Sequence, residues 1–470
     1  MCSVTPVSGL GGSDGPGARR RGAAATAVLL LLGAACGNDW GRSAETATPG
    51  SSPAVDENGA NGGDGDTIPG DTNPDEHVPV DAPGVTDTEI RVGGVVSVTN
   101  PLGGGYGDAF EGAQAYFDMV NSEGGIYGRR LVIASKRDDN LANNRSEVQG
   151  LITQDSVFAA LPMAALLFQG ADLLVREQIP TFGWTINAEW SSTPADPRPN
   201  LFGQAGSYLG FANPTPVLPW LAQEIGAHQI GVLAYNVAAQ SRDCARGVEN
   251  SFDEYGEATD SNISYVDKSL GYGVADLSAQ VSAMKDAGVD LVTTCMDTNG
   301  VVTLAREMRK QRLDAVQYLP NGYSRQLVEE YGDLFEGSFV RTDFAQFEVD
   351  DKPAGLENYL EWIEKAGSQP TENSVVGWLN ADLFVTGLRA AGPDFDRQKV
   401  IDAINRMTDY DGDGLLEGVD WTREHDAPGP PCQFLSEIRD REFVPAFTEP
   451  GKPFVCVVVD GDGVTSENAD

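Results

Sequence analysis

The amino-acid sequence predicts an α/β fold in which two mostly parallel sheets each carry helices on both faces. Short apolar runs rich in β-branched residues alternate with segments that repeat apolar residues at helical spacing along the chain after residue 86. A stretch from Asn200 to Pro219, punctuated by Gly, Pro and Asn, divides these repeats into two groups. We therefore expect two α/β units joined by a crossover rather than one long sheet.

The first unit opens with the clearest strand–helix–strand pattern in the chain. The run Ile90–Val98 is apolar and predicts a buried strand. The segment 107–122 repeats apolar residues at helical spacing from Phe110 to Val120, and Gly124 ends this predicted helix. Further strands are predicted at 131–134, 158–161 and 180–184, with a helix at 168–177.

The second unit continues the same alternation. Its predicted strands are 229–235 and 289–294, its predicted helices are 244–255 and 300–310, and a later helix is predicted at about 398–407. In open sheets of parallel strands, ligands bind where the carboxyl ends of the strands meet loops and helix starts. The loops that follow the predicted strands are therefore the candidate binding loops.

The composition is that of a soluble acidic protein. The 470 residues are enough for two domains, and 41% of them are hydrophobic. Asp and Glu total 70 against 32 Lys and Arg, which gives a formal charge of -38. Nucleic-acid binding needs basic patches, so this balance argues against a nucleic-acid partner.

The N-terminus predicts export. Three arginines, Arg19 to Arg21, precede an apolar run from Ala23 to Ala35 that is too short to span a bilayer as a helix. The run ends in LLGAAC, which resembles the signal of a bacterial lipoprotein, and this resemblance implies that Cys36 is lipidated after residues 1–35 are removed. We expect an extracytoplasmic protein held at the outer face of the cell membrane by that lipid alone. Secretion without a lipid is the alternative.

A disordered acidic tether is predicted at 36–85. Between Arg42 and Arg91 there is no Lys or Arg, and Gly, Pro, Asp, Asn and Thr dominate. Such a segment buries too little apolar surface to offset its ordering entropy. The last ten residues, 461–470, are expected to form a tail.

Four cysteines beyond Cys36 predict disulfides, because the chain is exported and their number is even. Three pairings are open. The order that closes the shortest loops, Cys244 with Cys295 and Cys432 with Cys456, is the one we expect. No CxxC is present and the histidines are scattered, so a metal site built on these residues is disfavoured.

Several strings resemble the solute-binding proteins of branched-chain amino acid ABC transporters. They are AYFDMVNSEGGIYGRRL, VFAALPMAALLFQGADLLVREQIPTFGW, and then, in order, HQIGVLAYN, DAGVDLVTTCMD, YLPNGYS and NSVVGWLNADLFVTGLRAAG. The resemblance covers about residues 86–460. It implies the type I periplasmic binding fold, with two Rossmann-like lobes joined by a three-stranded hinge. Lobe I would be 86–206 plus 343–415, and lobe II 207–342 plus 416–460.

The same resemblance implies a function. A monomer of this family captures a small ligand, an amino acid or a related amide or carboxylate, between its lobes by hinge closure and delivers it to an ABC permease. A ligand sensor that signals to a membrane partner is the main alternative, and an extracytoplasmic hydrolase is a distant one. The sequence has no nucleophile elbow and no histidine placed with a nucleophile and an acid, so we do not expect an enzyme.

The resemblance also places ligand contacts on loops of both lobes. The candidate residues are Asn100, Tyr106, Met163, Ala164, Ala165, Trp184, Thr185, Asn187, Gln240, Ser241, Asp297, Thr298, Asn321 and Tyr323. Some depart from the family pattern. Ala164 and Ala165 stand where relatives carry hydroxyls for a ligand carboxylate. Asn321 stands where many have an acid for the ligand ammonium, a charge that Asp297 could supply instead. These departures argue against an ordinary α-amino acid as the ligand.

Two segments partly match the motifs of other ligands. The loop GGGYGDAFEG lacks the GxGxxG spacing of a dinucleotide site, because Asp108 stands at the third glycine position. The segment DYDGDGLLEGVD places Asp409, Asp411, Asp413 and Asp420 as in a calcium loop of EF-hand type. An acidic turn is the alternative for that segment, and calcium is the one cofactor that the sequence suggests.

Overall fold

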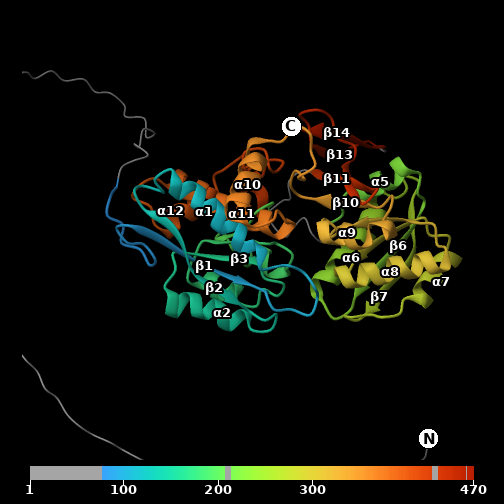
Figure 1. Cartoon of the computed structure of the whole chain (residues 1–470), viewed down its shortest axis with the longest axis horizontal. Coiled ribbons are helices and arrows are strands. Elements are labelled where there is room, and N and C mark those ends of the chain that lie inside the picture. Colours follow the sequence, from blue (N-terminus) through green and yellow to red (C-terminus); the bar gives the residue numbers. More distant parts are fainter. Residues whose placement is uncertain (1–76, 207–212, 426–431, 462, 470) are drawn as a thin grey trace, which may run out of the picture. The chain divides into compact units, whose positions relative to one another are not determined.

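A computed structural model describes residues 77–206, 213–425, 432–461 and 463–469 (Figure 1). All of them belong to one compact unit of the chain, Ile68–Asp470. The predicted signal peptide, the lipidation residue Cys36 and the tether up to residue 76 lie outside the described residues. Within the described part of the chain, no helix is long and apolar enough to cross a membrane.

The first sheet is wholly parallel, with the strand order β2-β1-β3-β4-β5. Its strands are β1 (Glu89–Val96), β2 (Arg130–Asp138), β3 (Ala159–Ala164), β4 (Thr181–Gly183) and β5 (Leu201–Gly203). Every residue of β3 is buried, as expected for a central strand that helices cover on both faces.

Helices from two distant parts of the sequence cover this sheet. They are α1 (Asp108–Ser122), α2 (Asn144–Gly150), α3 (Ala171–Arg176), α10 (Ala354–Lys365), α11 (Glu372–Ala391) and α12 (Arg397–Ile404). Helices α1 and α11 pack together on one face, while α2 and α3 pack on the other (Figure 1). We call this sheet and its helices lobe I.

The second sheet has the order β14-β13-β11-β10-β9-β8-β6-β7, and β12 pairs with β11. Its strands are β6 (Gln229–Tyr235), β7 (Asn262–Leu270), β8 (Leu291–Cys295), β9 (Val316–Leu319), β10 (Phe339–Thr342), β11 (Cys432–Arg439), β12 (Glu442–Pro445), β13 (Phe454–Asp460) and β14 (Gly463–Ala469). Strands β6 to β10 pair in parallel, and β11 to β14 add an antiparallel extension.

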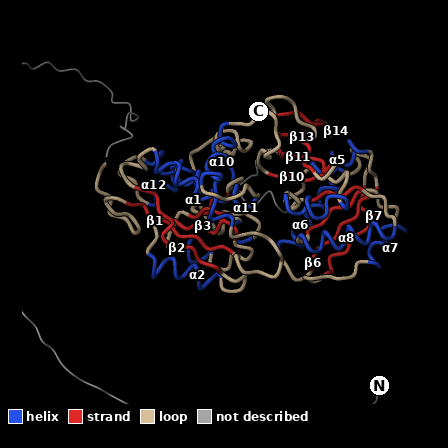
Figure 2. The backbone as a smooth tube through the Cα atoms, viewed as in Figure 1, coloured by secondary structure: helices blue, strands red, loops and turns tan. Residues whose placement is uncertain are grey.

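Helices also cover both faces of this second sheet, and together they form lobe II. They are α5 (Val217–Ile225), α6 (Ala239–Tyr255), α7 (Ser278–Asp286), α8 (Thr298–Gln311) and α9 (Arg325–Tyr331). Helices α5 and α6 pack on one face, and α7 and α8 on the other. Figure 2 shows the strands in two groups, each surrounded by helices.

The chain passes between the lobes after β5, after β10 and between α12 and β11. The short helix α13 (Trp421–Glu424) lies on the third of these connections. The second and third connections pair with each other, because Phe344 and Leu416 form a bridge and Ala345 N donates to Leu415 O at 2.9 Å. The predicted two-lobed α/β fold is therefore confirmed.

The prediction of a tether is wrong for residues 77–85. Residues 77–85 are part of the fold, since Val80, Ala82 and Val85 pack against the core. The fully buried side chain of Arg129 fixes this segment, donating to Val78 O at 2.7 Å and to Thr86 O at 2.8 Å. A distant arginine, rather than local composition, orders these residues.

The prediction of a tail at 461–470 is also wrong for the part that the structure describes. Residues 463–469 form β14, which pairs with β13 from Asp460–Gly463 to Phe454–Ala469. Val464 is buried, and it anchors the inner face of this edge strand. Its short, polar and glycine-led sequence gave little strand signal.

Both expected disulfides are present, and both lie in lobe II. Cys244 on α6 is bonded to Cys295 at the end of β8, and Cys432 on β11 is bonded to its cross-strand partner Cys456 on β13. The nested pairing is therefore confirmed. Because neither bond joins the two lobes, neither restricts a movement of one lobe against the other.

Candidate functional site

A cavity of about 1420 Å³ lies where the loops at the carboxyl ends of the strands in the two lobes face each other. Lobe I contributes the β1–α1 loop from Leu102 to Tyr106, Leu166, and Trp184 to Ile186. Lobe II contributes Tyr235, Gln240, Tyr272, the segment Met296–Asn299, and Asn321. This position is the one that parallel α/β sheets provide for ligands.

The two lobes touch at the margin of this cavity. Gln240 Nε2 donates to Leu166 O, and Asn299 Nδ2 donates to Leu102 O, each at 3.4 Å. Both donors belong to the first turns of lobe II helices, and both acceptors belong to loops of lobe I. The lobes are therefore close together in this structure.

Nine of the fourteen candidate ligand residues line the cavity. They are Tyr106, Trp184, Thr185, Gln240, Ser241, Asp297, Thr298, Asn321 and Tyr323. Two of these already have structural partners: Ser241 Oγ accepts from Tyr235 N at 2.8 Å, and Tyr323 donates its hydroxyl to Glu348 at 2.7 Å.

The other five candidates do not reach the cavity. Met163 and Ala164 are buried residues of β3, and Ala165, which directly follows the strand, is also buried. Asn187 is buried and donates to Ala165 O at 3.2 Å, whereas Asn100 donates to Ser97 O at 3.0 Å within its own loop. Strand β3 extends to Ala164, so the first cavity-facing side chain of the second loop is Leu166.

Four aromatic side chains and one carboxylate form the most distinctive part of the cavity wall. The rings of Tyr106 and Trp184 in lobe I have centroids 6.5 Å apart, and those of Tyr235 and Tyr272 in lobe II are 5.0 Å apart in an edge-to-face arrangement. We call these four residues the aromatic group. Tyr235 and Tyr272 were missed from the sequence, although they end or follow the adjacent strands β6 and β7.

The charge of Asp297 acts on three members of the aromatic group. Burial, followed by the charge of Asp297, raises the pKa of Tyr106 to about 12. Burial followed by the same carboxylate raises the pKa of Tyr235 and that of Tyr272. The three phenol rings therefore lie close to Asp297 and stay protonated at neutral pH.

Asp297 is held in place by its role as the N-cap of α8. One carboxylate oxygen accepts from Gly300 N at 2.9 Å. Gly300 also allows a close approach of Tyr235, because a Cβ at this position would lie 2.3 Å from the Tyr235 hydroxyl oxygen. The sequence DTNG thus fixes the carboxylate and leaves room for the phenol beside it.

A second charged group lines the cavity near the connections between the lobes. Arg341 lies on β10 and Asp343 directly follows this strand, and the two form an ion pair at 2.9 Å. Glu372, the first residue of α11, lies near both. Its side chain faces the cavity while protein surrounds it, and burial followed by the charge of Asp343 raises its pKa to about 8, with Arg341 opposing. Sequence reasoning missed these residues because β10 and α11 are separated by a whole helix.

The structure does not support the predicted calcium loop. Among the described residues, the four aspartates 409, 411, 413 and 420 do not form a group of carboxylates close enough to share an ion. Tyr410 and Val419 bridge instead, Asp411 accepts from Asp413 N, and Asp420 caps α13. The acidic turn, rather than the metal loop, describes this segment.

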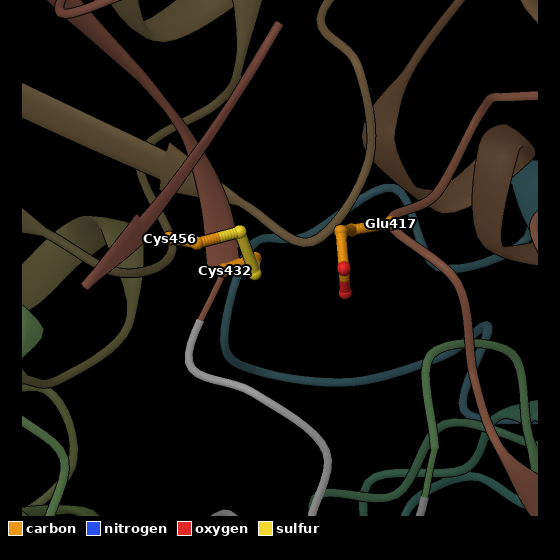
Figure 3. A group of neighbouring side chains, drawn as sticks. All are labelled: Glu417, Cys432 and Cys456. Atoms are coloured by element: carbon orange, nitrogen blue, oxygen red, sulfur yellow. A yellow bond between two sulfur atoms is a disulfide. The ribbon is translucent and has the colours of Figure 1, made fainter. Parts of the chain in front are cut away.

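One close group of metal-binding residue types occurs in the described ranges, namely Glu417, Cys432 and Cys456 (Figure 3). The two sulfur atoms are bonded to each other as a disulfide, as Figure 3 shows. Since a cysteine binds a metal as its thiolate and both sulfur atoms are in the disulfide, this group does not provide a metal site.

The two lobes, the three connections and the enclosed cavity define a class of protein that binds a small molecule between two α/β lobes. Residues 89–441 match the sequence profile of a family described as "Periplasmic binding protein". The chain belongs to this family, of the type I fold. No curated protein sequence matches the chain significantly.

Solved structures share this fold at low sequence identity. A branched-chain amino acid ABC transporter protein from Thermus thermophilus with bound valine is 19% identical, with a TM-score of 0.64 over 76% of this chain and 95% of that one. A fatty acid ABC transporter substrate-binding protein from Thermomonospora curvata is 18% identical, with a TM-score of 0.62 over 82% and 93%. A solute-binding protein from R. palustris in complex with 4-hydroxybenzoate is 17% identical, with a TM-score of 0.60 over 76% and 95%.

Proposed function

We propose that this protein is the extracytoplasmic solute-binding component of an ABC importer, which captures a small ligand between its lobes and presents the closed form to a membrane permease. The cavity between the two sets of strand-end loops is the observation that carries this proposal. The descriptions of related structures mention valine, a fatty acid and 4-hydroxybenzoate, so the fold leaves the ligand class open.

Hinge closure is the mechanism that the connections support. A ligand first rests on one lobe, and rotation about the three connections brings the other lobe over it. Contacts such as Gln240 to Leu166 and Asn299 to Leu102 then hold the lobes together. A ligand that touches both lobes adds binding energy only in the closed form, and it shifts the population toward that form.

Within the cavity, we propose that Tyr106, Trp184 and Thr185 of lobe I and Asp297 and Asn321 of lobe II contact the ligand. Gln240 and Thr298 stand beside them on the second lobe. None of these side chains is arranged as a nucleophile with a base among the described residues, which favours binding over catalysis.

A thermal-shift screen tests solute binding. The purified mature chain is heated with amino acids, amides, amines, short carboxylates and aromatic acids. A ligand is expected to increase the free energy of unfolding by RT ln(1 + [L]/Kd) and therefore to raise the melting temperature. Small-angle scattering should then show a smaller radius of gyration with that ligand. Absence of any shift across all the classes would count against the transport function.

We also propose that a lipid on Cys36 holds the protein at the membrane. Changing Cys36 to alanine removes the residue that would carry the lipid, so it is expected to move the protein from the membrane fraction of the producing cells into the medium. Mass spectrometry of the mature N-terminus checks the modification. An unmodified N-terminus on the wild-type protein would favour simple secretion.

A further inference from the structure

We propose that the ligand is an organic cation, whose positive centre lies beside Asp297 and against the faces of the aromatic group. This inference rests on the proposed solute-binding function and names the chemical class of its ligand. Four features of the described cavity wall support it: its charges, its aromatic rings, the shortage of donors at two places that could hold a carboxylate, and its unpaired acceptors.

The cavity wall is strongly acidic. Its carboxylates are Asp108, Asp297, Glu329, Glu330, Asp343, Glu348, Glu372, Glu417 and Glu424. Its only basic side chains among the described residues are Arg325 and Arg341. Arg341 is paired with Asp343 at 2.9 Å, and Arg325 lies 3.7 Å from Glu348. An anionic ligand would therefore meet a negative potential with both arginines already engaged, whereas a cation would be attracted.

The aromatic group adds a second attraction for a cation. The negative face of an aromatic ring binds a cation within about 6 Å of its centroid, and the interaction strengthens when water is excluded. Here four such rings line one cavity, and three of them lie in the field of a single carboxylate. Rings around one acidic group form the arrangement that recognises ammonium and quaternary ammonium groups.

In the described cavity wall, two places that could hold a carboxylate are short of donors. The second loop of lobe I presents Leu166, which offers no hydroxyl, and the third presents Thr185 as its one hydroxyl, between Trp184 and Ile186. The start of α8 faces the cavity, but Asp297 already accepts from its Gly300 N–H and neutralises the positive end of this helix. The Gly300 N–H of that helix start is therefore not available to a ligand carboxylate, and Asp297 itself would repel one.

Unpaired acceptors complete the pattern. Gln240 Oε1 has no hydrogen-bond partner, and its orientation is fixed because Nε2 donates to Leu166 O. Gln204, only 5% exposed, also lines the cavity with an unpartnered Oε1. Buried acceptors without donors are costly, so a ligand that brings N–H groups would satisfy them.

Calorimetric titration of the mature chain with matched probes tests the charge. Isoamylamine is compared with isoamyl alcohol and isovalerate, and choline is compared with its uncharged carbon isostere, 3,3-dimethylbutan-1-ol. We expect at least one cation to bind at least tenfold more tightly than its neutral and anionic counterparts. A stronger response to isoamylamine would favour N–H donors, and a stronger response to choline would favour the rings.

Two variants test the residues. Asp297→Asn keeps a good N-cap but removes the charge, so it should weaken cation binding at least tenfold while leaving the ligand-free melting temperature nearly unchanged. Asp276→Asn is the matched control, since Asp276 accepts from Ser278 N at the start of α7 outside the cavity wall. Tyr272 is 39% exposed, so Tyr272→Leu should fold normally and lose affinity that Tyr272→Phe retains.

The outcomes separate the two proposals. If a neutral or anionic probe binds as tightly as its cationic counterpart, or if Asp297→Asn binds the cation as well as Asp276→Asn does, the cation proposal is wrong although solute binding stands. If no cationic probe binds, the cation proposal is also overturned. The wider thermal-shift screen then decides solute binding on its own.

Discussion

Alanine at Gly112 or at Gly377 is expected to lower the free energy of unfolding by about 3 kcal/mol or more, because it overpacks the closest helix contact of lobe I. A Cβ at Gly112 on α1 would lie 1.7 Å from Ser374 O of α11, and a Cβ at Gly377 on α11 would lie 1.9 Å from Ala109 O of α1. Both obstacles are backbone atoms, which no rotamer change can remove. The helices would have to separate along the contact that joins the two sequence halves of the lobe.

Urea denaturation of the purified variants measures this effect, and two further glycines provide graded controls. Nothing lies within 4 Å of a Cβ at Gly271, so Gly271→Ala should be nearly neutral. A Cβ at Gly387, also on α11, would meet only side-chain atoms of Ile404 and Val400, the nearest at 2.7 Å, and these can shift. Gly387→Ala should therefore lower the free energy of unfolding by more than Gly271→Ala and by less than Gly112→Ala. Equal stability of Gly112→Ala and Gly271→Ala would mean that α1 and α11 do not approach so closely.

This helix contact also illustrates what the sequence predicts and what it leaves open. The apolar spacing from Phe110 to Val120 correctly predicts α1 and its buried face. The pairing of Gly112 with Gly377 is invisible to such a pattern, since the two residues are far apart in the chain and a glycine in a helix carries no periodic signal. Alternation of strands and helices determines the fold class, whereas close approaches between distant helices need coordinates.

The sequence predicted only part of the candidate site, again because local patterns do not give exact positions in space. Loops after strands were expected to meet at the ligand, and Tyr106, Trp184 and Asp297 do line the cavity. Strand ends, however, decide which side chains of a loop face inward. Strand β3 extends to Ala164, so Met163 belongs to the sheet and Leu166 to the cavity. The predicted strand ends at residue 161 and β3 ends at Ala164, and this difference of three residues, which composition does not resolve, changes the predicted contact set.

Long-range pairing explains the remaining differences. Residues 77–85 are ordered by hydrogen bonds from the buried guanidinium of Arg129, and β14 by pairing with β13. Neither segment has enough apolar residues to predict its own order. Likewise, Arg341 and Glu372 reach one cavity wall from elements that are separated by α10. Local patterns do not contain these contacts.

The stability of lobe I is expected to depend on pH through the buried carboxylate of Asp382. Tyr116 and Tyr410 donate their hydroxyls to its two oxygens at 2.5 and 2.7 Å. Burial raises the pKa of Asp382 from 3.8 to about 6, although the hydrogen bonds from Tyr116 and Tyr410 and the charge of Arg389 oppose this rise. The charge of Asp413 acts in the same direction as burial. Because the folded state holds the proton more tightly than the unfolded state, this group favours folding most below about pH 4 and progressively less up to about pH 6.

Asp382→Asn removes this titration. A shift of two units corresponds to about 3 kcal/mol, so the stability of wild type relative to Asp382→Asn should fall by up to that amount between pH 4 and pH 6 and then level off. Asp382→Ala should be destabilised at all these pH values by about 2 kcal/mol or more, because the buried Tyr116 loses its acceptor. Asp118→Asn, an exposed change on α1, is the control for general charge effects. If the free energies of unfolding of wild type and Asp382→Asn change in parallel from pH 4 to pH 7, the pKa of Asp382 is not raised by folding. The hydrogen bonds from Tyr116 and Tyr410, which lower the pKa, would then fully offset the effect of burial, which raises it.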